Sequence, residues 1–207
     1  MGMIGHLRAI TEEQLSTFQQ NPASLGDFLH GKARANSANL MAALQRAQEI
    51  GLQAIGKPEE KEKARLEIIR ELTAAGVKLP TDGPNEDGLS LEKSWHSLHY
   101  LLTGSAQEVD SPLGNAILGG KEIGPDMGYG PARFLDARQV QEVSSALSKV
   151  PNHDLARRFD LRAINAAKVY ACDDEGDLEL AQHYFEHVVK YYAEAAKQRN
   201  AMLLYIL

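Results

Sequence analysis

The chain has 207 residues, 43% of them hydrophobic, so it is long enough to bury a hydrophobic core as a single domain. Its formal net charge of −6 disfavours general nucleic-acid binding, although a net charge does not exclude a local basic patch. The one cysteine, Cys172, excludes an intrachain disulfide and favours a reducing compartment.

The start of the chain lacks the charged segment and the long apolar run of a secretory signal. No apolar run reaches the roughly 20 residues that a membrane-spanning helix needs. We therefore expect a cytoplasmic protein that binds neither a membrane nor nucleic acid.

The first predicted element is a strand over residues 3–10, where aliphatic residues partly alternate. Thr11 and Gln14 then have the spacing of a capping box, which predicts a helix from there to about Gln20. The short stretch over residues 25–31 favours neither a helix nor a strand.

Two longer helices are predicted over residues 36–53 and 58–75. Pro58 stands at a first-turn position of the second helix, where its missing N–H costs nothing. A loop rich in proline, glycine and acidic residues follows, up to Leu89.

The most informative stretch begins there. Ser90 is a suitable N-cap and Gly104 a suitable C-cap, so the pattern predicts one helix between them. At helical spacing, one stripe of this helix is apolar and is expected to be buried: Leu91, Trp95, Leu98 and Leu102. The polar side chains predicted beside that stripe are Glu92, His96 and His99.

The segment after this helix mixes apolar and glycine-rich runs. Residues 115–118 are apolar enough for a short buried strand, and residues 132–135 predict another. Between them, the glycines and prolines of residues 119–131 predict a series of tight turns. Asp136 and Gln139 form a capping pair that predicts the next helix.

The last third is predicted to be mostly helical. Asp154 is expected to cap a helix that reaches about Ala171, and a long helix is predicted over residues 178–198. The residues expected on the buried face of the long helix are Ala181, Phe185, Val188, Tyr192 and Ala196. Residues 202–206 form a strand-like run. The predicted fold class is therefore α+β, with a small sheet that includes both chain termini and packs against several amphipathic helices.

Four segments together resemble the YfbM-like family of small uncharacterised bacterial proteins: MGMIG, LSLEKSWHSLHYLLTG, SPLGNAILGG and LARRFDLRAIN…VYA. The resemblance implies a single α+β domain over residues 1–207 in a bacterial protein. It implies no established activity, because the family is known chiefly as a domain of unknown function. The helical stretch at about residues 31–80 is longer than expected in compact members, and we interpret it as an insertion.

Metal and cofactor motifs are weak in this sequence. His183, Glu186 and His187 match the H-x-x-E-H spacing of one class of zinc peptidases. The two histidines, however, lie opposite the apolar stripe of their helix, and no motif for a third ligand follows.

The glycine cluster has neither a phosphate-loop nor a dinucleotide-binding pattern. The acidic residues after Cys172 disfavour a reactive thiolate. We therefore expect no metal and no cofactor.

One constellation remains as a candidate ligand site, with His99 on the central helix and four polar residues on the turns that follow: Glu122, Asp126, Tyr129 and Arg133. The planar guanidinium of Arg133 suits a carboxylate or phosphate, and Tyr129 could form an aromatic wall. In the structural alternative, His99 is a satisfied residue that holds the turn region, and Arg133 pairs internally with Asp126 or Glu122.

Two functional classes stay open. The sequence favours a non-catalytic protein-binding module, such as an inhibitor or immunity-type protein, because an acidic chain can recognise a basic partner by charge complementarity. The alternative is a small-ligand-binding protein or an enzyme that uses a cleft near His99, Tyr129 and Arg133.

Overall fold

The computed structural model describes residues 2–30, 45–50, 64, 67–68, 70 and 88–207. Contacts divide the chain into two units, one made of residues 1–27 and 83–207 and the other of residues 28–82. Residues 45–50 of the second unit are helical. The rest of the helices predicted over residues 36–53 and 58–75, and most of the predicted insertion at 31–80, lie outside the described residues.

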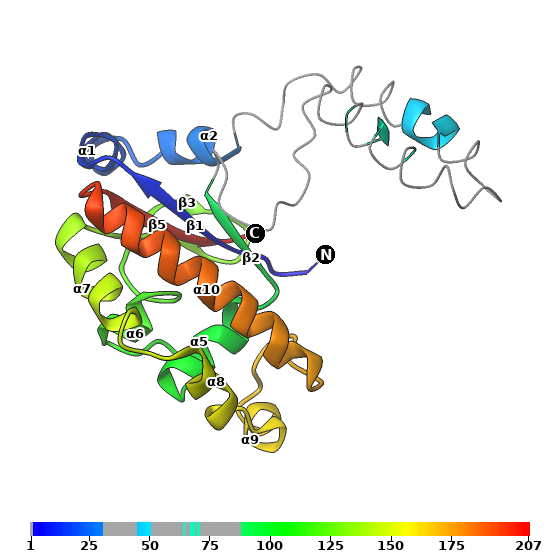
Figure 1. The fold of residues 1–207 in the computed structure, drawn as a ribbon. Helices are drawn as coiled ribbons and strands as arrows, with labels where there is room; N and C mark the ends of the chain where they lie inside the picture. Colours follow the sequence, from blue (N-terminus) through cyan, green and yellow to red (C-terminus); the bar gives the residue numbers. More distant parts are fainter. Residues whose placement is uncertain (1, 31–44, 51–63, 65–66, 69, 71–87) are drawn as a thin grey trace. The chain divides into compact units, whose positions relative to one another are not determined.

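The first unit contains a five-stranded sheet in the order β2-β1-β5-β4-β3, with every described neighbour antiparallel (Figure 1). The strands are β1 (Gly5–Ile10), β2 (Leu89–Glu92), β3 (Lys121–Asp126), β4 (Pro131–Leu135) and β5 (Ala201–Ile206). The N-terminal strand β1 pairs with the C-terminal strand β5 along its whole length, from Gly5 opposite Ile206 to Ile10 opposite Ala201. The predicted α+β class, with both termini in one sheet, is confirmed.

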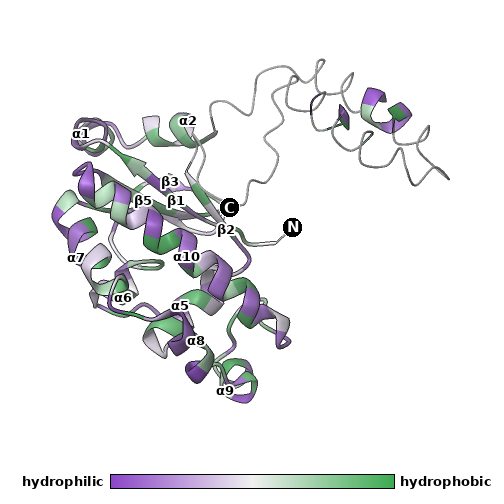
Figure 2. Cartoon of the chain, in the orientation of Figure 1, coloured by the Kyte–Doolittle hydropathy of each residue, from purple (hydrophilic) through white to green (hydrophobic). Residues whose placement is uncertain are grey.

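In the described residues, the helices lie between these strands in chain order. Their bounds are α1 (Glu12–Gln20), α2 (Ser24–His30), α5 (Trp95–Thr103), α6 (Pro112–Asn115), α7 (Ala137–Leu147), α8 (Asn152–Arg158), α9 (Leu161–Ala166) and α10 (Gly176–Lys197). Figure 1 shows α10 running along the sheet, and Figure 2 shows both hydrophobic and hydrophilic residues on it. One core cluster joins the sheet to α5, α7, α8 and α10, because apolar residues from each of them are buried together.

Three local helix signals in the sequence are confirmed. Thr11 with Gln14, and Asp136 with Gln139, form complete capping boxes at the starts of α1 and α7. Gly104 ends α5 in a left-handed conformation, with φ 77°. Each of these three signals involves residues that lie within one or two helical turns of each other.

The predicted start of the central helix at Ser90 is wrong. Residues Leu89–Glu92 form strand β2, and α5 begins only at Trp95, after Ser94. Leu89 and Leu91 alternate into the core, each 1% exposed, while their backbone pairs with β1. A leucine at position 91 fits a helical stripe as well as a strand alternation. Backbone pairing with β1 stabilises the strand here.

Two further predictions in the middle of the chain need correction. The predicted strand at residues 115–118 is instead the end of α6 and a turn, in which Ala116 is fully buried without strand pairing. The predicted turns at 119–131 contain the edge strand β3, whose pairing with β4 shifts register between Ile123 and Asp126. Gly124 has a φ of 82° inside that irregular segment. The glycine that was predicted to lie in a turn therefore lies at an irregularity within a strand.

The helix predicted from Asp154 to Ala171 is wrong in its cap and in its extent, because α8 begins at Asn152 with Pro151 as its N-cap and Asp154 lies in its first turn. It is divided into α8 and α9 by an extended break at Phe159 and Asp160. Asp160 caps α9 by accepting hydrogen bonds from the backbone N–H groups of Arg162 and Ala163, at 2.9 and 3.3 Å. The long helix was predicted correctly in outline, although Ala195 rather than Ala196 is buried at its end.

The N-terminal segment is fastened to the start of α5 and to the turn after α9. Trp95, 6% exposed, donates from its indole Nε1 to the backbone oxygen of Met3 at 3.3 Å. The Met3 N–H donates in turn to the Tyr170 hydroxyl at 3.0 Å. A Cβ added at Gly5 would lie 2.5 Å from the Trp95 Cβ, so the glycine permits the close approach. This packing places the MGMIG segment directly against the SWH segment.

Candidate functional site

His96 and His99 hold the loop that follows α5. The Nε2 atom of His96 donates to the backbone oxygen of Ala106 at 2.9 Å, and that of His99 donates to the oxygen of Gln107 at 2.8 Å. The Nδ1 atom of His96 accepts a hydrogen bond from the Tyr170 N–H at 2.9 Å. His96 can make both of its bonds only as a neutral imidazole protonated at Nε2. Both histidines are therefore used to position loop backbone.

His99 is enclosed by the fold. Its side chain is fully buried, and no described group bonds to its Nδ1 atom. Burial lowers the pKa of His99 below its ordinary value of 6.5, and this effect exceeds the opposing influences of the Gln107 hydrogen bond and the Glu108 charge. The neutral form is therefore stable at physiological pH. This arrangement corresponds to the structural alternative, in which His99 holds the turn region.

The guanidinium of Arg133 is bound by the protein itself. Its Nη1 donates to the backbone oxygen of Leu118 at 2.8 Å, while its Nη2 pairs with the carboxylates of Glu108 and, at 3.5 Å, of Glu122. The side chain is 23% exposed. Glu108 was not identified as a candidate, because only the fold brings it to Arg133, 25 residues later in the sequence. These bonds use the planar fork that was predicted to receive a ligand.

Asp126 organises the tip of the β3–β4 hairpin. Its Oδ1 accepts hydrogen bonds from the backbone N–H groups of Gly128 and Gly130, at 2.7 and 3.2 Å. The N–H of Met127 also donates to the Gly130 oxygen at 2.9 Å. Both glycines have positive φ angles, 118° and 97°, which a side chain would strain. Between them, Tyr129 is 48% exposed, so the tip presents an aromatic ring on an internally bonded loop.

The five candidate residues therefore occupy three places. Glu122 and Arg133 meet in an ion pair, and Asp126 supports the tip that carries Tyr129. Among the described residues, no hydrogen bond, ion pair or ring contact joins His99 to any of the other four. His99 and Arg133 instead bind neighbouring residues of one loop, through Gln107 and Glu108.

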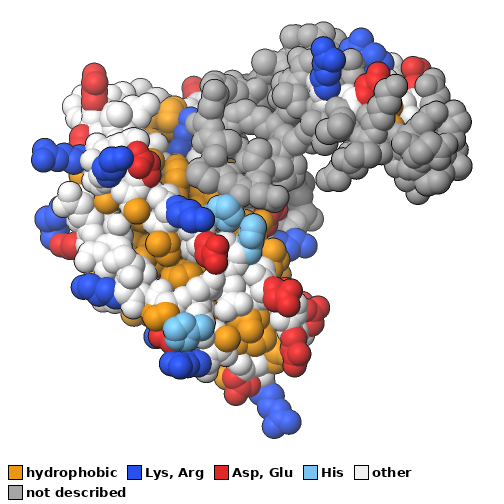
Figure 3. All heavy atoms as spheres, in the orientation of Figure 1, with side chains coloured by type: hydrophobic (Ala, Val, Ile, Leu, Met, Phe, Trp, Pro, Cys, Tyr) orange, Lys and Arg blue, Asp and Glu red, His pale blue; other side chains and the backbone are white. Residues whose placement is uncertain are grey.

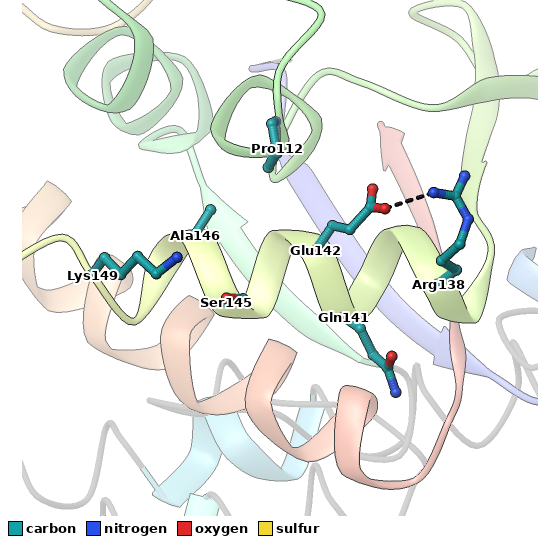
Figure 4. A pocket seen from close by; sticks show the side chains of 7 residues that line it. All are labelled: Pro112, Arg138, Gln141, Glu142, Ser145, Ala146 and Lys149. Carbon is teal, nitrogen blue, oxygen red and sulfur yellow. Dashed lines mark hydrogen bonds and ion pairs between the residues drawn. The ribbon is translucent and has the colours of Figure 1, made fainter.

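Among the surface hollows of the described residues, three can be compared with the candidate residues, and one of these three is lined by Glu122. The largest, of about 880 Å³, lies among α8, α9 and the start of α10. A second, of about 400 Å³, lies between the end of α1 and the β3–β4 hairpin, and a third, of about 490 Å³, lies along α7. Figure 4 shows the third, where Arg138 already pairs with Glu142 at 2.6 Å. None of the three is lined by His99, Tyr129 or Arg133.

The structure also shows the surroundings of the H-x-x-E-H histidines and of Cys172, which the sequence did not favour as sites. His183 is exposed, and its ring centroid lies 4.7 Å from that of His187 with the rings edge to face; Glu186 accepts a hydrogen bond from Asn152 at 2.9 Å. In the described part of the chain, no three His, Cys, Asp or Glu side chains are grouped so as to hold a metal ion. Burial, together with nearby aspartates, raises the pKa of the Cys172 thiol to about 11.

None of the helices among the described residues is both long enough and apolar enough to cross a bilayer.

Comparisons with known proteins agree on the family. The profile of a domain of unknown function, DUF1877, matches residues 1–205. The crystal structure of a protein of unknown function, YfbM from Escherichia coli, is similar with a TM-score of 0.60 and 15% sequence identity, over 99% of each chain. A comparison with curated proteins finds no match. The predicted resemblance is confirmed, and the chain belongs to the DUF1877 family of domains of unknown function, with the fold seen in YfbM.

Proposed function

We propose that the chain is a non-catalytic protein-binding module of the bacterial cytoplasm, of the inhibitor or immunity type. The observation that carries this proposal is the β3–β4 hairpin tip, where Tyr129 is 48% exposed on a loop bonded internally by Asp126. Tyrosine is enriched among the residues that dominate binding energy, and a rigid loop loses little entropy when a partner binds.

The other chemically capable side chains support the same proposal, because the fold already uses them. Arg133 is paired, His99 is fully buried, and Cys172 is fully buried with a raised pKa. The alternative, a small-ligand site near His99, Tyr129 and Arg133, has less support because these residues line none of the three hollows.

Photo-crosslinking tests this proposal. A benzoylphenylalanine residue in place of Tyr129 should give a discrete protein adduct in the native cytoplasm. The matched control carries the same group at Lys197, whose side chain is 78% exposed on α10, and it should give none.

Competition with unlabelled protein makes the test specific. The adduct should disappear with excess native chain, whereas Tyr129→Ala should compete roughly thirtyfold less well, the effect of losing a contact worth about 2 kcal/mol. Equal adducts at both positions, or equal competition by both proteins, would contradict a role for the hairpin tip.

A further inference from the structure

The hollow beside α8 and α9 is lined by both apolar and polar side chains. Its volume is about 880 Å³, and it is formed by α8, α9, the break between them and the first turn of α10. Phe159, Leu161 and Leu178 line it and are each only partly buried, so apolar surface faces the solvent there. We call this hollow, with its lining residues, the α8–α10 groove.

Carboxylates line the same hollow. Asp160, Glu175 and Glu179 line the groove and are exposed. The side chains of Glu175 and Glu179 have no hydrogen bond or ion pair with any described residue, whereas the one lining cation, Arg157, pairs with Asp154 at 3.1 Å. Figure 3 shows acidic side chains gathered beside apolar surface at the lower right, where Figure 1 draws the start of α10.

The sign of the local field follows from a comparison of magnitudes. The N-terminus of α10 contributes roughly half a positive elementary charge. Three acidic side chains within its first residues, those of Glu175, Asp177 and Glu179, each contribute a full negative charge and outweigh the dipole. An anionic ligand is therefore repelled, and an uncharged apolar segment would bury carboxylates without partners.

A basic side chain on an apolar segment satisfies both parts of the groove. The aliphatic stem of a lysine or arginine can cover the apolar side chains of the groove while its cationic group meets the carboxylates. We propose that the α8–α10 groove receives an apolar, lysine- or arginine-containing segment of a partner protein. This inference rests on the proposed protein-binding function and names the chemistry of a second contact surface.

Labelled peptides added to the full-length protein test the groove. A peptide of alternating lysine and leucine should bind and should shift the backbone amide signals of residues 156–161 and 175–179. Peptides in which glutamate replaces lysine, or glycine replaces leucine, should bind more weakly. The Glu175→Gln/Glu179→Gln double variant should weaken binding about tenfold at low salt and less at physiological salt, as expected for exposed charges.

The control removes the same charge from another surface. Glu13 and Asp110 are exposed and have no described side-chain partner, so Glu13→Gln/Asp110→Asn changes the net charge equally. This variant should change affinity less than about twofold. Equal weakening by both double variants would show that binding reports only net charge. Amide shifts outside the groove, or displacement of the peptide by an equal concentration of spermidine, would also overturn the inference.

The two proposals fail separately, because the hairpin tip and the groove share no residue. A partner that crosslinks at Tyr129 and binds the Gln variants unchanged would support the function and reject the groove. Peptide binding in the groove without an adduct at Tyr129 would support the groove and reject the role of the hairpin tip.

Discussion

Trp95→Ala is the most direct test of how this fold is held together. Trp95 is 6% exposed, belongs to the main core cluster and bonds to the Met3 backbone oxygen at 3.3 Å. Its ring also stacks with those of His96 and Tyr170, with centroids 4.7 and 6.1 Å apart. Deleting a large buried aromatic ring costs about 3–5 kcal/mol, and a hydrogen bond accounts for about 0.5–1.5 kcal/mol of such a loss. We therefore expect Trp95→Ala to lose about 3–5 kcal/mol of unfolding free energy.

Urea unfolding followed by far-ultraviolet circular dichroism measures this loss, because Trp95 is the one tryptophan and its fluorescence disappears with it. Trp95→Phe keeps a ring in the core but loses the donor, so it should cost less than the alanine variant. Tyr129→Ala is the matched control, since a 48% exposed aromatic residue should change stability by less than about 0.5 kcal/mol. A loss below about 1 kcal/mol for Trp95→Ala would refute the assignment of Trp95 to the core.

The remaining predictions concern the sheet, the buried histidine and the loop clamp. Removing residues 202–207 deletes most of β5, which lies between β1 and β4, so the shortened chain should lose its cooperative thermal transition; an equally sharp transition would be inconsistent with a central β5. Because burial lowers the pKa of His99, the unfolded chain binds a proton that the folded chain does not, once the pH falls below 6.5. The stability that the neutral, buried His99 contributes should therefore be fully present above pH 6.5 and be lost as the pH falls toward the lowered pKa. Urea midpoints at about pH 7.5 and about pH 5 should then differ more in the native chain than in His99→Gln. Arg133→Ala should cost about 1–3 kcal/mol, because it releases the Leu118 oxygen and two carboxylates; Arg138→Ala, whose side chain is 73% exposed, should cost less than about 0.5 kcal/mol in the same urea assay.

The sequence predicted features that depend on nearby residues. The capping boxes at Thr11 and Asp136 were recognisable because both partners lie within one helical turn. The pairing of the two terminal strands was predicted because both runs are strand-like and each needs backbone partners. The exposed tyrosine at the hairpin tip was identified as a candidate, although its support by Asp126 depends on the loop conformation.

Features that depend on distant contacts could not be predicted in this way. Strand β2 was assigned to a helix, because only pairing with β1 shows that Leu89 and Leu91 alternate rather than follow a helical stripe. The bonds of His96 to Tyr170 and of Arg133 to Glu108 join residues 74 and 25 positions apart, and no sequence motif signals them. The α8–α10 groove was missed because its lining begins at a break inside a segment predicted to be one helix.

The central place of β5 has a consequence for the speed of folding. In the sheet order, β5 is the strand that connects the β1–β2 pair to the β3–β4 pair, and pairing Gly5 with Ile206 closes a loop containing nearly the whole chain. Loop-closure entropy must be overcome before these contacts stabilise the sheet, and folding rates fall as the mean sequence separation of contacts rises. Refolding is therefore expected to be slow for a chain of this helix content, with the β3–β4 hairpin protected from amide hydrogen exchange earlier than the β1–β5 ladder.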